Sequence, residues 1–481
     1  MNGLFKKFIE YAMGNGIVVI LGVISTPIVY RLIGPVERGK ADLFVTYTSL
    51  LVLLLTMGID QAFIRYYNDE DKNSRGQLLR KSVKMPILLS LILGILCIIF
   101  NNVLSRLIVN EADLALKESL ILSSLFALNI IISIISNFAI INIRMKQKAK
   151  NYSLVGVSNK ISYLIFLFIF FSRFNENYIT LVFTTVFANL IMLIVGILFE
   201  KNDWFNISKK GNLKTTTKDL TKYGAPFIFS MGLTWIFQSV DRLSIQRFST
   251  SEQVGLYSGA MSIVAILNTI QGIFTTFWTP VAYERYSNNP CDTKFFSKIN
   301  EIVSFVMLLI ATLLIGGKDL LSIMFLGDKY KGSEFIFPFL VLMPIMYTIS
   351  ETTVLGVNFK KKTKAHIFIA LASAISNIVG NFILVPKYGA KGAAISTGLA
   401  YVIFFITRSY FGNKYYKINI NYKKLFISVL SVYILAIYSS VYKFNLVIFI
   451  LTTLVVLIIL YLYKNLISET YELIKIKLKK K

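Results

Sequence analysis

Long apolar stretches alternate with short polar segments along almost the whole chain. A membrane-spanning helix needs about 20 mainly apolar residues, and about fourteen of the stretches reach that length. Because little sequence is left between them, the pattern predicts an all-α integral membrane protein without a soluble catalytic domain. The expected helices are 10–33, 40–66, 83–102, 115–141, 150–172, 177–200, 222–247, 254–283, 297–317, 332–357, 364–385, 390–411, 424–442 and 444–463.

Charge follows the same alternation. The chain has 51 Lys and Arg against 25 Asp and Glu, a formal net charge of +26, and the basic residues gather in every second polar segment. Cytoplasmic loops of membrane proteins are enriched in Lys and Arg, so both termini are expected in the cytoplasm, with an even number of spans. Topology and contact with anionic lipid headgroups then explain the excess charge, and we expect no nucleic-acid partner.

The polar segments exclude several function classes. None is longer than roughly 25 residues, and no GxxxxGK[ST] loop is present to hold nucleotide phosphates. Cys97 lies in an apolar stretch and Cys291 in a polar one, so no disulfide is expected. His366 is the only histidine, which argues against a histidine-based metal site. We therefore predict no cofactor and no bound metal.

The longest polar segment, 201–222, is basic and poor in apolar residues. We expect it to be a cytoplasmic linker between a six-helix half at 1–200 and a second six-helix half at 223–411. Residues 412–481 would add two helices and a basic cytoplasmic tail.

A weak internal repeat supports this division. Arg31 and Gly39 correspond, at one constant offset, to Arg247 and Gly255. Transporters are often built from repeats, with the substrate site at the repeat interface. A chance match of a few residues is the alternative.

Polar residues recur on one face of several expected spans. In the second span, Asp42, Thr46, Ser49, Thr56 and Asp60 have the spacing of one helix face. Such groups are costly in hydrocarbon and are expected to face a cavity, with hydrogen bonding between helices as the alternative for each. The remaining candidates for the cavity wall are Asn129, Ser133, Asn137, Gln238, Asn268, Gln271, Asn377 and Asn381.

Charged residues inside the spans give a sharper signal. Lys160 lies about ten residues into the fifth span, roughly 15 Å along a helix, and Arg242 follows Asp241 deep in the seventh. Buried cations suit a phosphate-bearing substrate, although a local ion pair is the alternative for Asp241 and Arg242. Asp60 or Asp241 is the candidate for coupling to a H+ or Na+ gradient. Cations nearer the span ends, which snorkelling to headgroups also explains, are Arg31, Arg65, Arg247 and Arg408.

Three segments carry a family resemblance. Residues 223–260 begin with Tyr-Gly-x-Pro, contain the Asp-Arg pair and continue with Gly-x-Tyr-Ser-x-Ala. This segment resembles the seventh and eighth helices of the Wzx-type oligosaccharide repeat-unit flippases of the MOP superfamily. Residues 385–402, VPKYGAKGAAISTGLAYV, are similar to that family's eleventh-to-twelfth helix turn, and Arg-x-x-Gly-Pro at 31–35 also fits. The motifs mark the superfamily branch well and the substrate poorly.

The resemblance implies a V-shaped pair of six-helix bundles that opens alternately to each side of the bacterial cytoplasmic membrane. It implies transport of undecaprenyl-pyrophosphate-linked oligosaccharide units for O-antigen, capsule or exopolysaccharide, with the polysaccharide polymerase and chain-length machinery as further candidate partners. The expected pyrophosphate ligands are Arg242, Lys160 and Arg31, with Arg65 and Arg247 as further cavity cations.

Two other functions stay open on the sequence. A cation-coupled exporter of small molecules from the same superfamily would use acids in its cavity, and Asp60 and Asp241 are available. A membrane glycan polymerase or transferase would need catalytic groups on an outer loop, and the sequence offers no such constellation. Transport without covalent catalysis is the expected activity.

Overall fold

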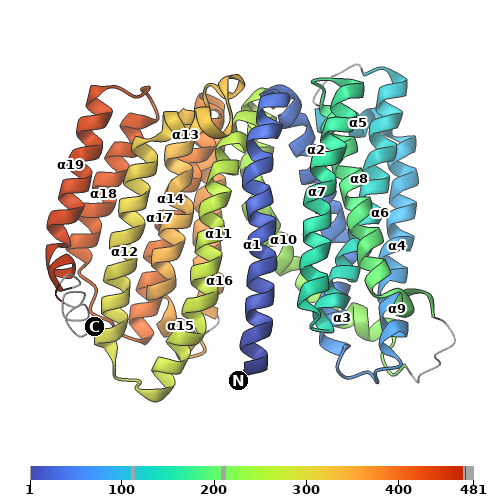
Figure 1. Cartoon of the computed structure of the whole chain (residues 1–481), viewed down its shortest axis with the longest axis horizontal. Coiled ribbons are helices and arrows are strands. Elements are labelled where there is room, and N and C mark those ends of the chain that lie inside the picture. The colour runs from blue at the N-terminus through green and yellow to red at the C-terminus, as the bar shows by residue number, and fades with distance from the viewer. Residues whose placement is uncertain (1, 110–113, 207–212, 363, 470–471, 473–481) are drawn as a thin grey trace. The chain divides into compact units, whose positions relative to one another are not determined.

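The computed structural model describes residues 2–109, 114–206, 213–362, 364–469 and 472. These residues form nineteen α-helices and one short 3-10 helix, and in each compact unit the long helices run side by side (Figure 1). Eleven of the helices are long and apolar enough to cross a membrane. The prediction of an all-α, multi-pass membrane protein is confirmed.

Three of the expected spans fall outside that group of eleven. The apolar part of α1 (Asn2–Leu32) and the whole of α19 (Leu446–Leu462) are shorter than the others. The third, α10 (Thr217–Phe248), has ample length but a more polar sequence. Its charged residues are Lys218, Asp219, Lys222, Asp241, Arg242 and Arg247. Charges inside a span are rare and usually functional, which makes α10 relevant to the site.

The first compact unit extends to Gln246. Its centre is α6 (Leu116–Met145), which packs against α4 (Arg75–Ile99) and α8 (Tyr178–Phe199). On the other side of α8, α7 (Ala149–Phe174) packs against both α8 and α1. The remaining helices of this unit are α2 (Pro35–Thr56), α3 (Ile59–Tyr66), α5 (Asn101–Val109), α9 (Lys201–Phe205) and most of α10.

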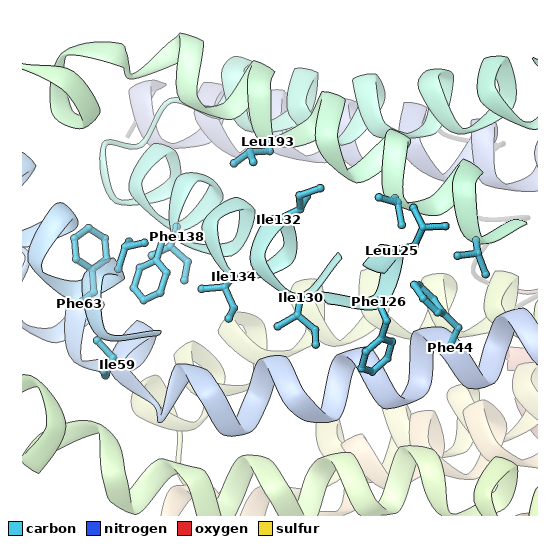
Figure 2. Packing of buried hydrophobic residues seen from close by; sticks show 14 of the residues in the cluster. Phe44, Ile59, Phe63, Leu125, Phe126, Ile130, Ile132, Ile134, Phe138 and Leu193 are labelled. Atoms are coloured by element: carbon cyan, nitrogen blue, oxygen red, sulfur yellow. The ribbon is translucent and has the colours of Figure 1, made fainter. Parts of the chain in front are cut away.

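Aromatic pairs join α2 and α3 to α6 in the core of the first unit (Figure 2). The rings of Phe44 and Phe126 meet edge to face at a centroid distance of 5.4 Å, and those of Phe63 and Phe138 at 6.1 Å. Lipid is as apolar as these side chains, so burial alone drives little association between spans. Close, geometrically specific packing of this kind therefore holds the helices together.

The second expected span, 40–66, is not one helix. It is interrupted at Met57 and Gly58, whose φ angles of 54° and 66° are left-handed, and α3 continues beyond the break. The backbone of Gly58 also meets that of Gly224 on α10: a Cβ atom on Gly224 would lie 2.7 Å from the carbonyl oxygens of both Met57 and Gly58. Two glycines are needed here because the two backbones touch.

The second compact unit begins at Arg247, inside α10 and after the predicted linker 201–222, of which 207–212 lie outside the described residues. Its most buried span, α14 (Ser333–Thr353), packs against α11 (Ser251–Asn288), α12 (Thr293–Gly316) and α17 (Ala390–Tyr415). The other elements are α13 (Lys318–Phe325), η1 (Asp328–Tyr330), α15 (Leu355–Phe359), α16 (Lys364–Tyr388), α18 (Tyr422–Ser439) and α19. Most of the expected basic tail, including 473–481, is outside the described residues.

Candidate functional site

A cavity of about 290 Å³ lies within the first unit. We call it the polar cavity because most of its lining residues have polar side chains, although most of the surface that they expose to it is carbon. Its wall comes from α2, α3, α6, α8 and one residue of α10. The predicted polar faces of the second and fourth spans supply much of this wall, so the structure brings these two faces together. The polar lining residues are Thr48, Ser49, Thr56, Asp60, Asn129, Ser133, Asn137, Thr185 and Asn189.

A chain of side-chain amides crosses this wall. Asn159 of α7 donates to Asn189 at 3.2 Å, Asn189 donates to Asn129 at 3.1 Å, and Asn129 donates to Thr48 at 3.5 Å. Each amide also has a second N–H and a further acceptor lone pair. The chain therefore fixes the orientation of the amides and leaves hydrogen-bonding capacity for a polar guest.

Asp60 is the only charged residue in the cavity wall among the described residues. It is 4% exposed and lies in the first turn of α3, directly after the Met57–Gly58 break. Its Oδ2 atom accepts a hydrogen bond from Gln61 at 2.9 Å, whereas its buried Oδ1 atom has no hydrogen-bond partner. A buried carboxylate oxygen without a donor is costly. A proton or a small cation at Oδ1 would remove that cost.

None of the five predicted cations lines this cavity in the described residues. Lys160 is half-buried on α7 and forms no ion pair there, and the charge that acts on it is that of Arg38. Arg38, which the sequence analysis did not select, pairs with Asp42 at 2.9 Å and lies over the ring of Tyr30. The i,i+4 spacing of Arg38 and Asp42 in the sequence could have indicated this ion pair.

The remaining predicted cations have different surroundings. Arg242 is half-buried on α10, its Nε atom is buried without a hydrogen-bond partner, and it forms no ion pair with Asp241 in the described structure. Asp241 is itself 6% exposed. Arg65 forms a surface pair with Asp69 at 2.7 Å, and both side chains are about half exposed. The exposed cations at the ends of α1 and α10 are Arg31 and Arg247.

Two of the predicted polar residues of the second half form hydrogen bonds between helices. Asn377 and Asn381 are buried between α16 and α17, where Asn377 donates to Thr397 at 2.9 Å and Asn381 lies 3.4 Å from the hydroxyl of Ser396. For Asn377 and Asn381, the alternative of hydrogen bonding between helices therefore applies. Gln238 is exposed on α10, and Asn268 and Gln271 are half-buried on α11.

Arg408 does not snorkel, contrary to the expectation from its position near a span end. It is 7% exposed, and its guanidinium binds Glu351 at 2.7 Å and Ser350 at 2.8 Å. The rings of Tyr347 and Phe404 lie 5.0 Å from it. A carboxylate on the neighbouring helix α14 holds the cation inside the unit. The sequence analysis did not select Glu351, an acidic residue within an apolar span that could have indicated a buried partner for a cation.

A family model described as polysaccharide biosynthesis protein matches residues 4–284, more than half of the chain. The chain belongs to this family. The polysaccharide biosynthesis protein match covers the first unit and nearly all of α11, and therefore the whole polar cavity.

Curated relatives match over most of their length. The chain is 22% identical to a putative O-antigen transporter of Shigella flexneri, covering 83% of this chain and 95% of that protein. It is 21% identical to the capsular polysaccharide biosynthesis protein CapF of Staphylococcus aureus, covering 85% and 99%. An uncharacterized membrane protein of Methanocaldococcus jannaschii is 22% identical, covering 81% and 82%.

Solved structures show the fold of this polysaccharide biosynthesis protein. The lipid II flippase MurJ in an inward closed conformation superposes with a TM-score of 0.70 at 18% identity, covering 95% of this chain and 100% of that one. An inward-facing multidrug resistance MATE family transporter of the MOP superfamily gives 0.56 at 14% identity, covering 84% and 93%. The MOP-type fold expected from the resemblance is confirmed.

Proposed function

We propose that this protein is a flippase that moves undecaprenyl-pyrophosphate-linked oligosaccharide units across the bacterial cytoplasmic membrane by alternating access. The observation that carries the proposal is the polar cavity of the first unit, whose hydroxyl- and amide-bearing lining residues come from α2, α6 and α8. Sugars present hydroxyl groups that both donate and accept hydrogen bonds, and Ser, Thr and Asn side chains match them. The relatives named for O-antigen transport and capsule synthesis support this substrate class.

Cations of the first unit would hold the pyrophosphate. Lys160 has no carboxylate partner in the described structure, and Arg38, whose charge acts on it, pairs with Asp42. Arg242 has a buried Nε atom that still lacks an acceptor. Phosphate oxygens would accept hydrogen bonds from these groups. The prenyl tail would stay in the bilayer while the polar head passes.

Asp60 would couple transport to an ion gradient in this scheme. Its Oδ1 atom has no hydrogen-bond partner, and Asp60 shares the cavity wall with Thr56, Ser133 and Asn137. These oxygens and a carboxylate suit a proton or a Na+ ion. Binding would neutralise the only charge that the described residues place in the wall.

The first test is the leaflet in which lipid-linked oligosaccharide is accessible, in spheroplasts with and without the protein. Accumulation in the cytoplasmic leaflet on loss of the gene, reversed by the intact gene, is expected. Export by a strain with no redundant transporter and no copy of this gene would refute the proposal.

Matched variants connect that test to the cavity. Asn137→Leu fills the cavity and should reduce export at normal protein level. Thr185→Val removes a hydroxyl of the wall, whereas Thr184→Val removes the adjacent hydroxyl, which binds the carbonyl of Thr180 outside the cavity. Export should fall for Thr185→Val and stay normal for Thr184→Val. Equal effects of the two substitutions on export would show that the hydroxyl of Thr185 in the cavity wall is not needed for transport.

A cation-coupled exporter of small molecules is the second candidate. The observation in its favour is that the charge in the cavity wall is the acid Asp60, which attracts cationic molecules. Drug susceptibility of the deletion strain distinguishes the candidates, because an exporter predicts increased sensitivity with normal delivery of lipid-linked oligosaccharide.

A further inference from the structure

A second polar cavity, of about 510 Å³, lies in the second unit. It is formed by the first turns of α12, the start of α18 with the segment before it, and the segment that follows α19. The cavity therefore lies at the start of one of the two additional helices and at the end of the other. Its polar lining residues are Thr293, Lys294, Ser297, Lys298, Asn300, Glu301, Ser304, Asn419, Asn421, Lys424, Tyr463 and Glu469.

Among the described residues, three lysines and two glutamates line this cavity, which gives its described wall one net positive charge. Lys424 binds Glu301 at 2.5 Å, and Lys298 binds Glu469, whose side chain is 63% exposed. Lys294 is exposed and forms no ion pair in the described part of the chain. An entering anion would meet Lys294 without competition. The anion could also replace Glu469 as the partner of Lys298, and the side chain of Glu469 would then rotate into the solvent.

Neutral groups of the cavity hold the lysines in place and add donors. The ring of Tyr463 covers the ammonium group of Lys424 at 3.9 Å, a cation–π contact that positions it. Asn421 uses its side-chain oxygen to accept from the backbone N–H of Lys424 at 3.0 Å. The amide NH2 of Asn421 is thereby left as a donor in the cavity wall.

The location of the cavity matches the membrane interface. α12 and α18 begin there and α19 ends there, so the cavity lies at the ends of spans. Beyond it, apolar side chains of α18 and α19 are open to the surroundings, with Phe426 66% and Tyr461 68% exposed. The positive-inside pattern puts this end in the cytoplasm, where the leaflet carries anionic lipids.

We propose that this cavity binds a phosphate-bearing anion of glycerophosphate type, carried either by an anionic phospholipid or by a soluble cytoplasmic metabolite. The phosphate would bridge Lys294 and Lys298 of α12 to Lys424 of α18, and so attach the two additional helices to the core of the unit. A volume of about 510 Å³ is within the range of ligand pockets. The site is independent of the transport proposal, since none of the residues proposed for transport lines this cavity.

Native mass spectrometry of the purified full-length protein in detergent tests the proposal with added phosphatidylglycerol. The triple variant K294Q/K298Q/K424Q should bind it more weakly, by about fivefold for each lysine that contacts the phosphate. The matched control K360Q/K361Q/K362Q removes three lysines of a loop outside the cavity and should bind normally. Equal binding by both triple variants would overturn the proposal.

A second variant keeps the test valid if the lysine variant folds poorly. E301Q/E469Q removes the competing carboxylates and should increase affinity severalfold, the opposite of a general loss of structure. No increase, or equally tight binding of zwitterionic phosphatidylcholine, would also overturn the proposal. Soluble glycerol 3-phosphate identifies the source: displacement of the lipid at similar concentration assigns a soluble metabolite, and failure to displace it assigns the phospholipid.

Discussion

Two sets of buried polar residues, one in each unit, differ in how far their hydrogen-bonding capacity is used. In the first unit they line an open cavity, and the carboxylate of Asp60 keeps one oxygen without a partner. In the second, Arg408 is matched by Glu351, and Asn377 is hydrogen-bonded to Thr397. Polar residues within spans therefore serve two purposes. Unsatisfied groups indicate where a guest or an ion can bind, and satisfied groups stabilise the helix packing.

Breaking the ion pair of the second unit should have the largest effect. Arg408→Ala leaves Glu351 charged and unpaired inside the unit, which costs about 3–5 kcal/mol. Thermal unfolding in detergent should show a strongly lowered Tm and little folded protein. The double variant R408M/E351Q removes both charges and should recover most of the loss. A stable Arg408→Ala protein would mean that this pair does not hold the unit together.

The helix break that presents Asp60 to the first cavity should be next in sensitivity. Gly58→Ala puts a side chain on a left-handed residue and against the backbone of Gly224, a change we expect to cost about 2–3 kcal/mol. Gly232→Ala on α10 is the control, because a Cβ atom there meets nothing within 4 Å. Unfolding midpoints of the two variants should differ clearly, and similar midpoints would argue against the close contact.

Neutralising Asp60 should affect transport more than stability, the reverse of Arg408→Ala. Asp60→Asn preserves the shape of the side chain and removes a buried charge that lacks a full set of donors. The free energy of unfolding should change by less than about 1 kcal/mol, whereas export should fall about tenfold and lose its dependence on the ion gradient. Gradient-driven export at the normal rate in this variant would remove Asp60 from the coupling step.

The smallest effect concerns Glu70, which anchors the segment before α10. Burial alone would raise the pKa of Glu70, but hydrogen bonds from the Thr215 hydroxyl and from the Thr215 and Lys214 N–H groups lower it overall. A carboxyl with a lowered pKa stabilises the folded form above its unfolded pKa, and this contribution disappears as the pH falls through the folded value. Protease cleavage near Lys214 should therefore increase in acid.

The control for that measurement is Glu70→Gln, which cannot titrate. Its cleavage near Lys214 should already be faster at neutral pH and should change less on acidification. Identical pH profiles for the variant and the natural protein would assign the acid effect to another group.

Features repeated along one helix could be predicted from the sequence, whereas features that join distant helices could not. The spacing of Ser49 and Thr56 was sufficient to predict a shared face of α2, and both line the cavity, whereas Asp42 and Thr46 of the same predicted face are not in its wall. Asp60 reaches the wall from α3, beyond the helix break that the spacing did not indicate. The pairing of Arg408 with Glu351 depends on how two helices 57 residues apart are aligned. Side-chain periodicity contains no information about that alignment. Without it, the position of Arg408 near a span end favoured the interpretation that its side chain extends to the headgroups.

The interruption of the helix in the second expected span could not be predicted for a related reason. Met57 is a good helix former, and nothing nearby marks a left-handed turn except Gly58. The close partner, Gly224, lies far along the sequence in the stretch that carries the family resemblance. Only the packed structure shows that the two glycines are needed together.

This contact has a consequence for biogenesis. Gly58 leaves the ribosome more than 160 residues before Gly224, and at 5–20 residues per second the interval is on the order of ten seconds or longer. During that time the break between α2 and α3 is in the insertion machinery or the bilayer without the helix that covers it. The nascent first unit must therefore wait for α10, and a truncated chain that ends before residue 217 would expose an incomplete helix joint to the quality-control proteases of the membrane.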